Sequence, residues 1–367
     1  MDVVALTCAA ALAYTWLGYP LLIRALASFS RGQLNSPMTH AATVSVVIAT
    51  RDASDAVRRR VTDLALTDYP AIVEIVVALD ASSIHPVPAE EVKDLRIPVK
   101  LVYGDTPGGK AATLNAGVRA ATGDILVFTD TQQRFAPSTV GRLATALMAD
   151  ERVGAVSGAL HTVGSGKMAE LYWRCERWLR RWEAHLYASV GVTGAVYAMR
   201  RRSWTPLPSG LILDDLYTPM RLVLERRRIA FEETALAFDA RQFAPHDEYL
   251  RKARTLTGVV QLCVWLPGVL IPWRNPIWFQ FVSHKLLRLL TPYLLLVGSL
   301  FWLGSMKAAV PPTVAVAALA GLIVVVMLPI LLSRRVRSLV WEGVLLQAAV
   351  VKATINAVRG NWNVWRN

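Results

Sequence analysis

GGKAATLNAGVRAATGDILVFTDTQ, residues Gly108–Gln132, is the stretch that predicts the fold of this chain. A Gly-Gly-Lys turn opens a helical segment, a Gly-Asp break ends it, and the apolar run Ile125–Phe128 follows. A short strand that is apolar on both faces is typical of a covered parallel sheet. Asp130 comes just after this strand, at the edge where open α/β sheets bind ligands. A lysine before the helix and a carboxylate after the strand suit a site for phosphate and a metal ion.

Upstream of this stretch the sequence repeats the pattern of strand, polar turn and helix. The run Arg58–Leu66 predicts a helix, and apolar runs predict three more strands, at Val44–Ala49, Val73–Leu79 and Val99–Tyr103. Strands that alternate with helices form a parallel sheet with right-handed crossovers. We therefore expect a mixed α/β fold.

An acid follows each of three predicted strands: Asp52, Asp80 and Asp130. An Asp after a strand is commonly the N-cap of the next helix, and this alternative stays open for each acid taken alone. Parallel strands bring their carboxyl ends to one sheet edge, so three acids there with Lys110 nearby favour a ligand site. A metal-binding Asp-x-Asp would have its second acid two positions after Asp130, where this chain has Gln132.

The composition fits a catalytic domain attached to membrane helices. The chain has 367 residues, of which 54% are hydrophobic and 18% charged, and its net charge is +13. Its basic and aromatic residues form no nucleic-acid-binding motif, so we expect no nucleic-acid partner. A basic chain with apolar segments fits an anionic membrane surface, with membrane lipids as partners. The scattered cysteines Cys8, Cys175 and Cys263 indicate neither a metal cluster nor a disulfide framework.

The first segment predicted to cross a membrane is the uncharged run Val3–Ile23, which spans about 30 Å as a helix. A cleaved signal peptide is the alternative, but the start lacks a basic region and no clear cleavage site follows. We therefore expect a retained transmembrane helix over residues 1–28. Arg24 and Arg31 follow the run, so the positive-inside rule predicts a cytosolic end after it and an N-terminus outside.

Two later apolar runs, Leu286–Leu303 and Val314–Leu332, predict a transmembrane hairpin over residues 284–333. Arg288 lies near its start and Arg334 just beyond its end, so both flanks are expected in the cytosol. The segments agree on an integral protein of a bacterial inner or plasma membrane, with the region between them cytosolic.

Two further stretches are apolar but interrupted. Val259–Trp278 is broken by three prolines and predicts interfacial helices over residues 259–283. Leu339–Val358 contains charged residues, so an amphipathic surface helix is favoured over a span, within a C-terminal region of residues 338–367. The end of the chain resembles a membrane-interface anchor, with Trp362, Trp365 and Arg366.

Six segments, in this order along the chain, resemble motifs of membrane-bound family-2 glycosyltransferases with the GT-A fold. They are SVVIATRD, VVALDASS, GGKAATLNAG, VFTDTQ, VTGAVYAMRR and LILDDLYTPMRL. The chain is similar to the broad group that includes cellulose, chitin and hyaluronan synthases and their smaller bacterial relatives. The resemblance implies a Rossmann-like, cytosolic GT-A domain over residues 40–258.

This resemblance implies a nucleotide-sugar site at the sheet edge. Thr50, Asp52 and Asp80 would bind the base and ribose of the donor. Lys110 would offset phosphate charge as a point cation, although a solvated lysine at a helix start is the alternative. Asn115 would either hold its local loop or touch the ligand, and both alternatives stay open.

The resemblance also implies a divalent cation, Mg²⁺ or Mn²⁺, bound by Asp130 across the donor diphosphate. Such ions take oxygen ligands and keep several waters, so one carboxylate with the phosphates can suffice. Gln132 can offer a neutral carbonyl oxygen, which predicts weaker metal binding than a second acid would give.

On the acceptor side, the resemblance implies that Asp215 is the base that deprotonates the acceptor hydroxyl. Asp214 would contact substrate or hold the loop, and Gly194 and Ala195 would form the acceptor-side loop. Direct attack by the activated hydroxyl implies inversion at the anomeric carbon. The alternative, in which both acids are helix N-caps, stays open.

The last motif is altered in this chain. Processive members carry Gln-x-x-Arg-Trp, whereas the equivalent positions here are Arg251, Arg254 and Thr255. Arg254 keeps the arginine and would bind the diphosphate. The missing Trp argues against long-chain processive synthesis. A basic interfacial helix that holds lipid headgroups is the alternative.

The sequence therefore predicts an inverting glycosyltransferase in cell-surface glycan synthesis. It would move a sugar from a nucleotide-sugar, expected to be a UDP-sugar, to a membrane-associated lipid or polysaccharide acceptor. The alternative is a non-catalytic membrane subunit that binds nucleotide-sugar and scaffolds or regulates a partner synthase. Three arginine runs, at residues 58–60, 200–202 and 226–228, are expected to be solvated or to face lipid headgroups.

Overall fold

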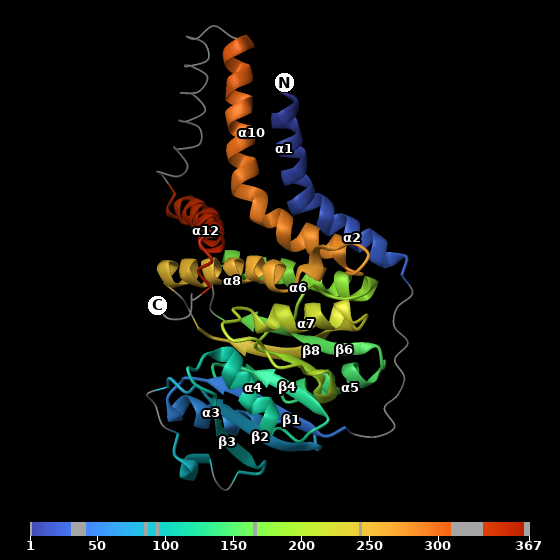
Figure 1. The fold of residues 1–367 in the computed structure, drawn as a ribbon, viewed down its shortest axis with the longest axis vertical. Helices are drawn as coiled ribbons and strands as arrows, with labels where there is room; N and C mark the ends of the chain where they lie inside the picture. Colours follow the sequence, from blue (N-terminus) through green and yellow to red (C-terminus); the bar gives the residue numbers. More distant parts are fainter. Residues whose placement is uncertain are drawn as a thin grey trace. The chain divides into compact units, whose positions relative to one another are not determined.

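The computed structural model describes residues 2–30, 42–83, 87–92, 95–163, 167–241, 244–309 and 333–362 (Figure 1). The chain forms two compact units. The sheet unit comprises Ile23–Gln242, Gln261–Gln280 and Trp362–Asn367, and the helical unit comprises Met1–Leu22, Phe243–Val260 and Phe281–Asn361. We describe each unit by itself.

The sheet unit contains one eight-stranded sheet with the order β3-β2-β1-β4-β7-β6-β8-β5. The strands are β1 Val44–Thr50, β2 Ile72–Leu79, β3 Val99–Tyr103, β4 Ile125–Thr129, β5 Gln133–Phe135, β6 Val153–Thr162, β7 Tyr197–Arg200 and β8 Arg228–Asp239. The first four strands are parallel, as the alternating pattern predicts. The mixed α/β fold class is confirmed.

Strand β7 reverses the direction of the sheet. It pairs antiparallel with both β4 and β6, whereas β6 and β8 are parallel to each other. The short strand β5 pairs antiparallel with β8 at the edge. This second half brings segments that are distant in sequence next to β4, the strand that precedes Asp130.

The helices of the sheet unit pack on both faces of the sheet. They are α3 Ser54–Ala65, α4 Lys110–Ala120, α5 Thr139–Met148, α6 Lys167–Leu186 and α7 Asp214–Leu224. Apolar residues of α3 and α5 share one buried core with alternate residues of β1, β2 and β4. On the other face α4 lies very close to the sheet, because a Cβ at Gly117 would be 2.9 Å from Val47 Cγ1.

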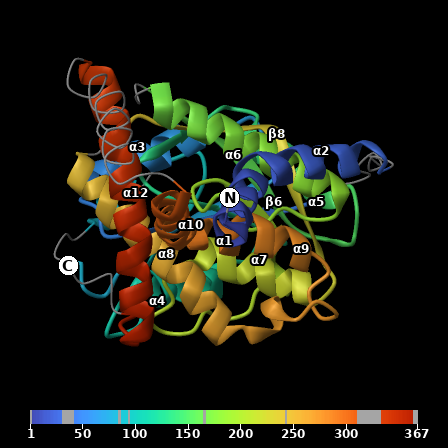
Figure 2. The same ribbon diagram turned by 90° about the horizontal axis from the view of Figure 1, so that it is seen from above.

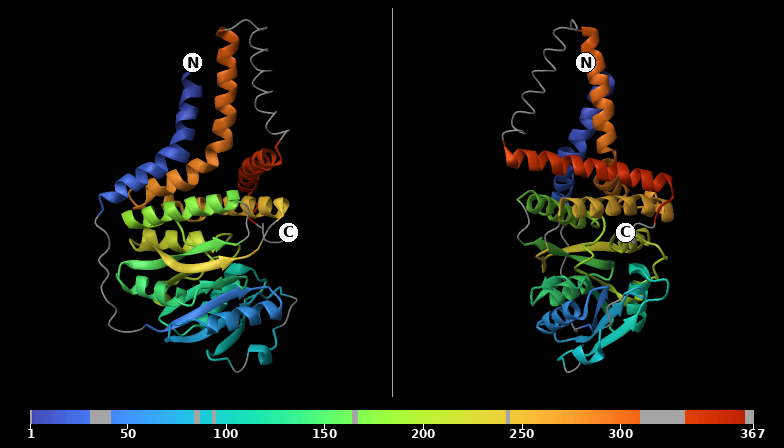
Figure 3. Two further views of the ribbon diagram at one scale, coloured as in Figure 1. Left: turned by 180° about the vertical axis from the view of Figure 1, so that it is seen from behind. Right: turned by 90° about the vertical axis from the view of Figure 1, so that its left-hand side faces the viewer.

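The helical unit contains the apolar helices. Its main elements are α1 Val3–Ala13, the following π-helical turn Tyr14–Gly18, α10 Leu287–Ala309 and α12 Arg334–Val358. Helices α1 and α10 lie side by side in both panels of Figure 3. They approach closely at Gly298, where a Cβ would be 2.9 Å from Cys8 Cβ. The indole Nε1 of Trp16 donates to Thr291 Oγ1 at 3.3 Å, which adds a polar contact between the two segments.

Among the described residues, two helical segments, Val3–Ser28 and Trp278–Ser305, are long and apolar enough to cross a membrane. They correspond to the first predicted span and the first half of the predicted hairpin. The second half, Val314–Leu332, lies outside the described residues, as do Arg31, Trp365 and Arg366. The predicted membrane orientation stays a prediction.

The remaining predicted boundaries differ in detail from the observed elements. Helix α8 runs without a break from Pro245 to Trp265, across the boundary predicted at residue 258. The region predicted as a C-terminal amphipathic helix is α12, a single long helix in Figure 2. Its residues Ala349, Val350 and Ala353 are buried, whereas Trp341 and Val344 are exposed, so the helix has two distinct faces.

A buried carboxylate, Glu74 in β2, fixes the neighbouring strands and the Gly-Asp break. Its Oε1 accepts hydrogen bonds from Ser45 Oγ at 2.6 Å and from Thr122 N and Oγ1 at 2.6 and 2.7 Å. Its Oε2 lies 2.5 Å from Lys100 Nζ of β3. Burial alone would raise the pKa of Glu74, but the bonds from Lys100, Ser45 and Thr122 outweigh it and lower the pKa to about 2.

We expect Glu74→Gln to lower the free energy of unfolding by about 2 kcal/mol at pH 7. The pKa of Glu74 is lower in the folded chain than its ordinary value of 4.5, so the ionised form stabilises the fold above pH 4.5. This stabilisation is lost as the pH falls toward 2, and the difference between wild type and variant should shrink. Urea unfolding at pH 7 and pH 3 measures the difference in free energy of unfolding between wild type and variant. An equal difference at both pH values would contradict this role of Glu74.

Candidate active site

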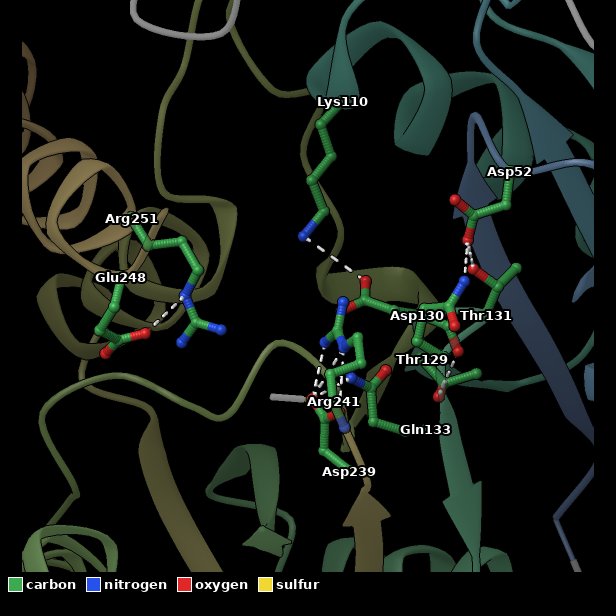
Figure 4. A network of polar contacts seen from close by, with 11 residues as sticks. Asp52, Lys110, Thr129, Asp130, Thr131, Gln133, Asp239, Arg241, Glu248 and Arg251 are labelled. Atoms are coloured by element: carbon green, nitrogen blue, oxygen red, sulfur yellow. Dashed lines mark hydrogen bonds and ion pairs between the residues drawn. The ribbon is translucent and has the colours of Figure 1, made fainter. Parts of the chain in front are cut away.

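The carboxyl ends of the parallel strands β1, β2 and β4 meet at one edge of the sheet, as predicted. Asp52, Asp80 and Asp130 follow these strands, and α4 begins at Lys110. Figure 4 shows Lys110, Asp52 and Asp130 in one polar region, with Asp239 and Arg241 beyond them. The fold therefore brings together residues that are far apart in sequence.

Lys110 is the cation at the centre of this edge. Its Nζ lies 3.1 Å from Asp214 Oδ1 and 3.9 Å from Asp130 Oδ1, and its side chain is 25% exposed. Burial alone would lower the pKa of Lys110, but Asp214, Asp130 and Asp215 outweigh burial and raise it. Lys110 therefore stays charged and joins the end of β4 to the start of α7.

Asp215 lies in the first turn of α7, against the Gly-Ala loop. A Cβ at Gly194 would be 3.2 Å from Asp215 Oδ2, so glycine permits this close approach. The backbone N–H of Val192 donates to the carbonyl of Asp215 at 2.9 Å. Burial and the neighbouring Asp214 raise the pKa of Asp215 to about 6, against the opposing effects of Lys110 and Arg180. A carboxylate that titrates near neutrality is suited to act as a general base.

Arg180 of α6 is a residue near this base that the sequence analysis missed. Its side chain is 12% exposed, and its Nη1 donates to Thr193 Oγ1 at 2.7 Å, one residue before Gly194. Thr193 is fixed in turn, because its N–H donates to Ser157 Oγ at 2.9 Å. The spacing of Glu176 and Arg180, four positions apart on one helix face, could have indicated this ion pair from the sequence.

Asp52 is held by the loop that follows β4. Its Oδ2 accepts hydrogen bonds from Thr131 Oγ1 and, at 2.8 Å, from Gln132 Nε2. Thr50 Oγ1 accepts from the backbone N–H of Asp52 at 2.9 Å. Gln132 thus uses its amide nitrogen toward Asp52. An acid at position 132 would instead repel Asp52, which explains why the second acid of an Asp-x-Asp is unfavourable here.

Asp80 is 3% exposed and fixes the turn before α4. It accepts four hydrogen bonds: two from Ser82, one from Arg51 Nε at 3.0 Å and one from the backbone N–H of Gly109 at 2.8 Å. Burial would raise its pKa, but these bonds outweigh burial and lower it. Four bonds occupy the usual acceptor sites of a carboxylate, so a base or ribose hydroxyl would have to replace one of them.

Asn115 and Arg254, two other predicted ligands, have different surroundings. Asn115 Nδ2 donates to the carbonyl of Leu207 at 2.9 Å, and its Oδ1 accepts from the N–H of Leu207 at 2.8 Å. These bonds favour the loop-holding alternative for Asn115. Arg254 belongs to α8 within the helical unit, and its binding to diphosphate stays a prediction.

A second cation near Asp130 was also missed. Arg241 forms a two-pronged pair with Asp239 at the end of β8, with contacts of 2.6 to 3.2 Å (Figure 4). Gln133 Nε2 donates to Asp239 Oδ2 at 2.9 Å and completes the group. The hydrogen bonds that Arg241 donates to Asp239 raise the pKa of Arg241 against the effect of burial, and the charges of Asp239, Asp130 and Asp52 add to this rise. Its approach to Asp130 depends on the pairing of β8 with β5, which no local pattern revealed.

The expectation that all three arginine runs are solvated is wrong for Arg60 and Arg200, which are 1% and 7% exposed. Arg200 Nη2 donates to the carbonyl of Leu147 at 2.8 Å, so its charge is spread over buried backbone acceptors. The sequence pattern does not distinguish the buried Arg200 from its neighbours Arg201 and Arg202, which are exposed or form surface contacts.

The candidate metal ligand is Asp130, with a side chain that is 36% exposed. Among the described residues there is no group of three or more His, Cys, Asp or Glu that could hold a metal ion by itself. An accessible oxygen ligand next to Lys110 and Arg241 fits a hydrated divalent ion that shares phosphate oxygens with the protein.

We expect Gly108→Ala to destabilise the chain more than Gly109→Ala. Both glycines have left-handed backbone, with φ of +90° and +107°, which costs an alanine about 1–2 kcal/mol. A Cβ at Gly108 would also lie 2.5 Å from Asp80 Oδ1, whereas a Cβ at Gly109 has no atom within 4 Å. Thermal unfolding of both variants measures the difference, and equal losses would contradict the tight packing of Asp80 on this turn.

Comparisons with known proteins find similarity in sequence and in fold. Residues 45–205 match the family described as Glycosyl transferase family 2. The structure is similar to the mannosyltransferase PcManGT from Pyrobaculum calidifontis in complex with GDP-Man and Mn²⁺, with a TM-score of 0.70, 20% identity, and coverage of 97% of this chain and 99% of that chain.

A further similar structure is glucosyl-3-phosphoglycerate synthase from Mycobacterium tuberculosis in complex with Mn²⁺, UDP-glucose and phosphoglyceric acid. It has a TM-score of 0.44 and 20% identity, and the match covers 64% of this chain and 87% of that chain. No curated protein sequence matches the chain. The sheet unit therefore has the GT-A fold, and its residues 45–205 match the glycosyl transferase family 2 model.

Proposed function

We propose that this chain is an inverting glycosyltransferase that moves a sugar from a nucleoside diphosphate sugar to a hydroxyl of a membrane-associated lipid or glycan. The observation that carries this proposal is the meeting of Lys110, Asp130, Asp214 and Asp215 at one sheet edge. Lys110 and Asp130 lie within residues 45–205, the region that matches family 2. A partly buried lysine among acids, with one acid of near-neutral pKa, suits transfer from a diphosphate donor.

Lys110 and Asp130 would form the donor end of the site. Lys110 is a charged, partly buried amine that can bind diphosphate oxygens by exchanging one of its acid partners. Asp130 would hold Mg²⁺ or Mn²⁺, which when bound neutralises charge on the leaving diphosphate. We expect a UDP-sugar from the sequence, whereas the similar mannosyltransferase holds GDP-Man, so both nucleotides are candidates.

Asp215 would act at the acceptor end. Its carboxylate takes the proton of the acceptor hydroxyl while the oxygen attacks the anomeric carbon from the face opposite the diphosphate. The new carbon–oxygen bond forms as the bond to phosphate breaks, and the diphosphate leaves with the electron pair. The configuration at the anomeric carbon is inverted. Arg180 helps to keep Asp215 ionised before the attack, because its charge opposes the rise in the pKa of Asp215.

The membrane-associated acceptor and the inner or plasma membrane location are supported by the two apolar helices, Val3–Ser28 and Trp278–Ser305. Arg24, near the end of the first segment, and Arg288, near the start of the apolar run Leu286–Leu303, favour a cytosolic sheet unit and an N-terminus outside. Nucleotide-sugars would then reach the site from the cytosol.

We expect Asp215→Asn to lower the turnover of sugar transfer by about 10²- to 10⁴-fold, because the amide cannot accept the hydroxyl proton. Binding of GDP or UDP with Mn²⁺ should be unchanged. The assay is product formation from a panel of GDP- and UDP-sugars, with a membrane lipid extract as the acceptor source. Wild-type turnover in the variant would contradict the role of Asp215 as the base. A wild-type protein that binds nucleotide but transfers no sugar would support the scaffold alternative.

We expect Arg180→Met to move the acid limb of the pH profile of kcat/KM to higher pH. The base works in its ionised form, so activity falls as the pH drops below the pKa of Asp215, which is about 6 in the wild type. Loss of the guanidinium removes an effect that lowers this pKa. Arg181→Met, at a neighbouring side chain that is 55% exposed, is the matched control. An unchanged limb in Arg180→Met would rule out this electrostatic role.

A further inference from the structure

Arg60 of α3 is the largest fully buried side chain of the described chain, with its side chain 0% exposed. Burial of a charged group is unfavourable unless it is paired and hydrogen-bonded. Burial lowers the pKa of Arg60 to about 10, although the neighbouring Asp63 opposes this effect. The contacts of Arg60 therefore indicate the role for which its unfavourable burial is retained.

The guanidinium of Arg60 contacts two structural elements besides its own helix. Its Nη1 pairs with Asp63, one turn further along α3. Its Nη2 donates to Thr129 Oγ1, at the end of β4, at 2.7 Å. Its central carbon lies 4.2 Å from the centre of the Phe135 ring, in β5. The cation is thus enclosed between α3, β4 and β5.

These contacts fall on both ends of one short loop, residues 130–132. At its start, Thr129 Oγ1 donates to the carbonyl of Asp130 at 3.3 Å, so Arg60 reaches the backbone of Asp130 through one hydroxyl. Beyond its end, the N–H of Phe135 donates to Asp63 Oδ2 at 3.3 Å. The ion pair of Arg60 and Asp63 therefore holds the chain before and after the loop.

We propose that Arg60 and Asp63 are positioning residues, a buried clamp that fixes the loop of residues 130–132 so that Asp130 can bind a divalent cation. This inference rests on the proposed function only in naming the cation. Gln132 is not an acid, and its side chain donates a hydrogen bond to Asp52. Within this loop, Asp130 is therefore the acid that would bind the metal. A site with a single carboxylate depends strongly on where that carboxylate lies.

A role in stability alone explains the pair less well. Buried ion pairs add little net stability, and apolar residues of similar size are often equally stable replacements. The position of the pair sets it apart, because its hydrogen bonds end on Thr129 and Phe135. The pair is also neutral overall. Removal of both residues together therefore changes the electrostatic potential at Asp130 little, and acts mainly on the geometry of the loop.

The test compares Arg60→Met/Asp63→Leu, which removes the clamp without a net change of charge, with Arg59→Met at an exposed position of the same helix. Mn²⁺ binding in the presence of GDP, and separately UDP, is measured by electron paramagnetic resonance on the full chain. We expect about tenfold weaker binding in the double variant, as is typical for residues that support a metal ligand. Arg59→Met should bind Mn²⁺ as the wild type does.

Hydrogen–deuterium exchange of the peptide that covers residues 129–135 gives a second readout, which does not depend on sugar transfer or on metal. Exchange should be faster in the double variant than in Arg59→Met. A folded double variant with wild-type exchange and wild-type Mn²⁺ binding would overturn the clamp. If the wild type bound no Mn²⁺ with either nucleotide, the proposed function would fail, and the exchange rates would still decide whether the clamp exists.

Thr129→Val and Thr129→Ser test the same link if the double variant does not fold. Valine removes the hydroxyl that joins Arg60 to Asp130, whereas serine keeps it. We expect weaker Mn²⁺ binding and faster exchange in Thr129→Val than in Thr129→Ser. Equal behaviour of the two variants would also overturn the proposal.

Discussion

The charge of Lys110 is the constraint on which the rest of the site depends. A partly buried amine is retained as a cation because Asp214 and Asp130 lie 3.1 and 3.9 Å from its nitrogen. These two acids come from the start of α7 and the end of β4, so the cation joins two segments that are far apart in sequence. Burial, together with the neighbouring acids Asp214 and Asp130, raises the pKa of Asp215 to about 6. One set of charges can therefore serve a phosphate end and a proton-accepting end.

Around this centre the chain uses further buried charges to fix the backbone. Asp80 holds the turn before α4, Arg180 holds the loop before Gly194, and Arg60 with Asp63 holds both ends of the loop after β4. Such bonds restrict where the charged groups can lie, which is what binding of a diphosphate and a metal ion requires.

The sequence predicted the parallel half of the sheet and the group of Lys110, Asp130 and Asp215 because both follow from local patterns and ordered motifs. It did not predict Arg180 or Arg241, whose approach to the site depends on the packing of α6 and the pairing of β8 with β5. The arginine run predicts a solvated face, whereas Arg60 is buried, because burial follows from packing, which composition does not report. Gln132 was considered as an oxygen ligand, whereas its bond to Asp52 depends on the meeting of two loops.

The most direct measurement of the central claim is a cryo-electron microscopy map of the full chain with Mn²⁺ and either GDP or UDP. The account predicts density for a cation in contact with Asp130 and for diphosphate against Lys110, with Asp215 facing the open acceptor side. Nucleotide and metal bound away from Lys110 and Asp130 would contradict it.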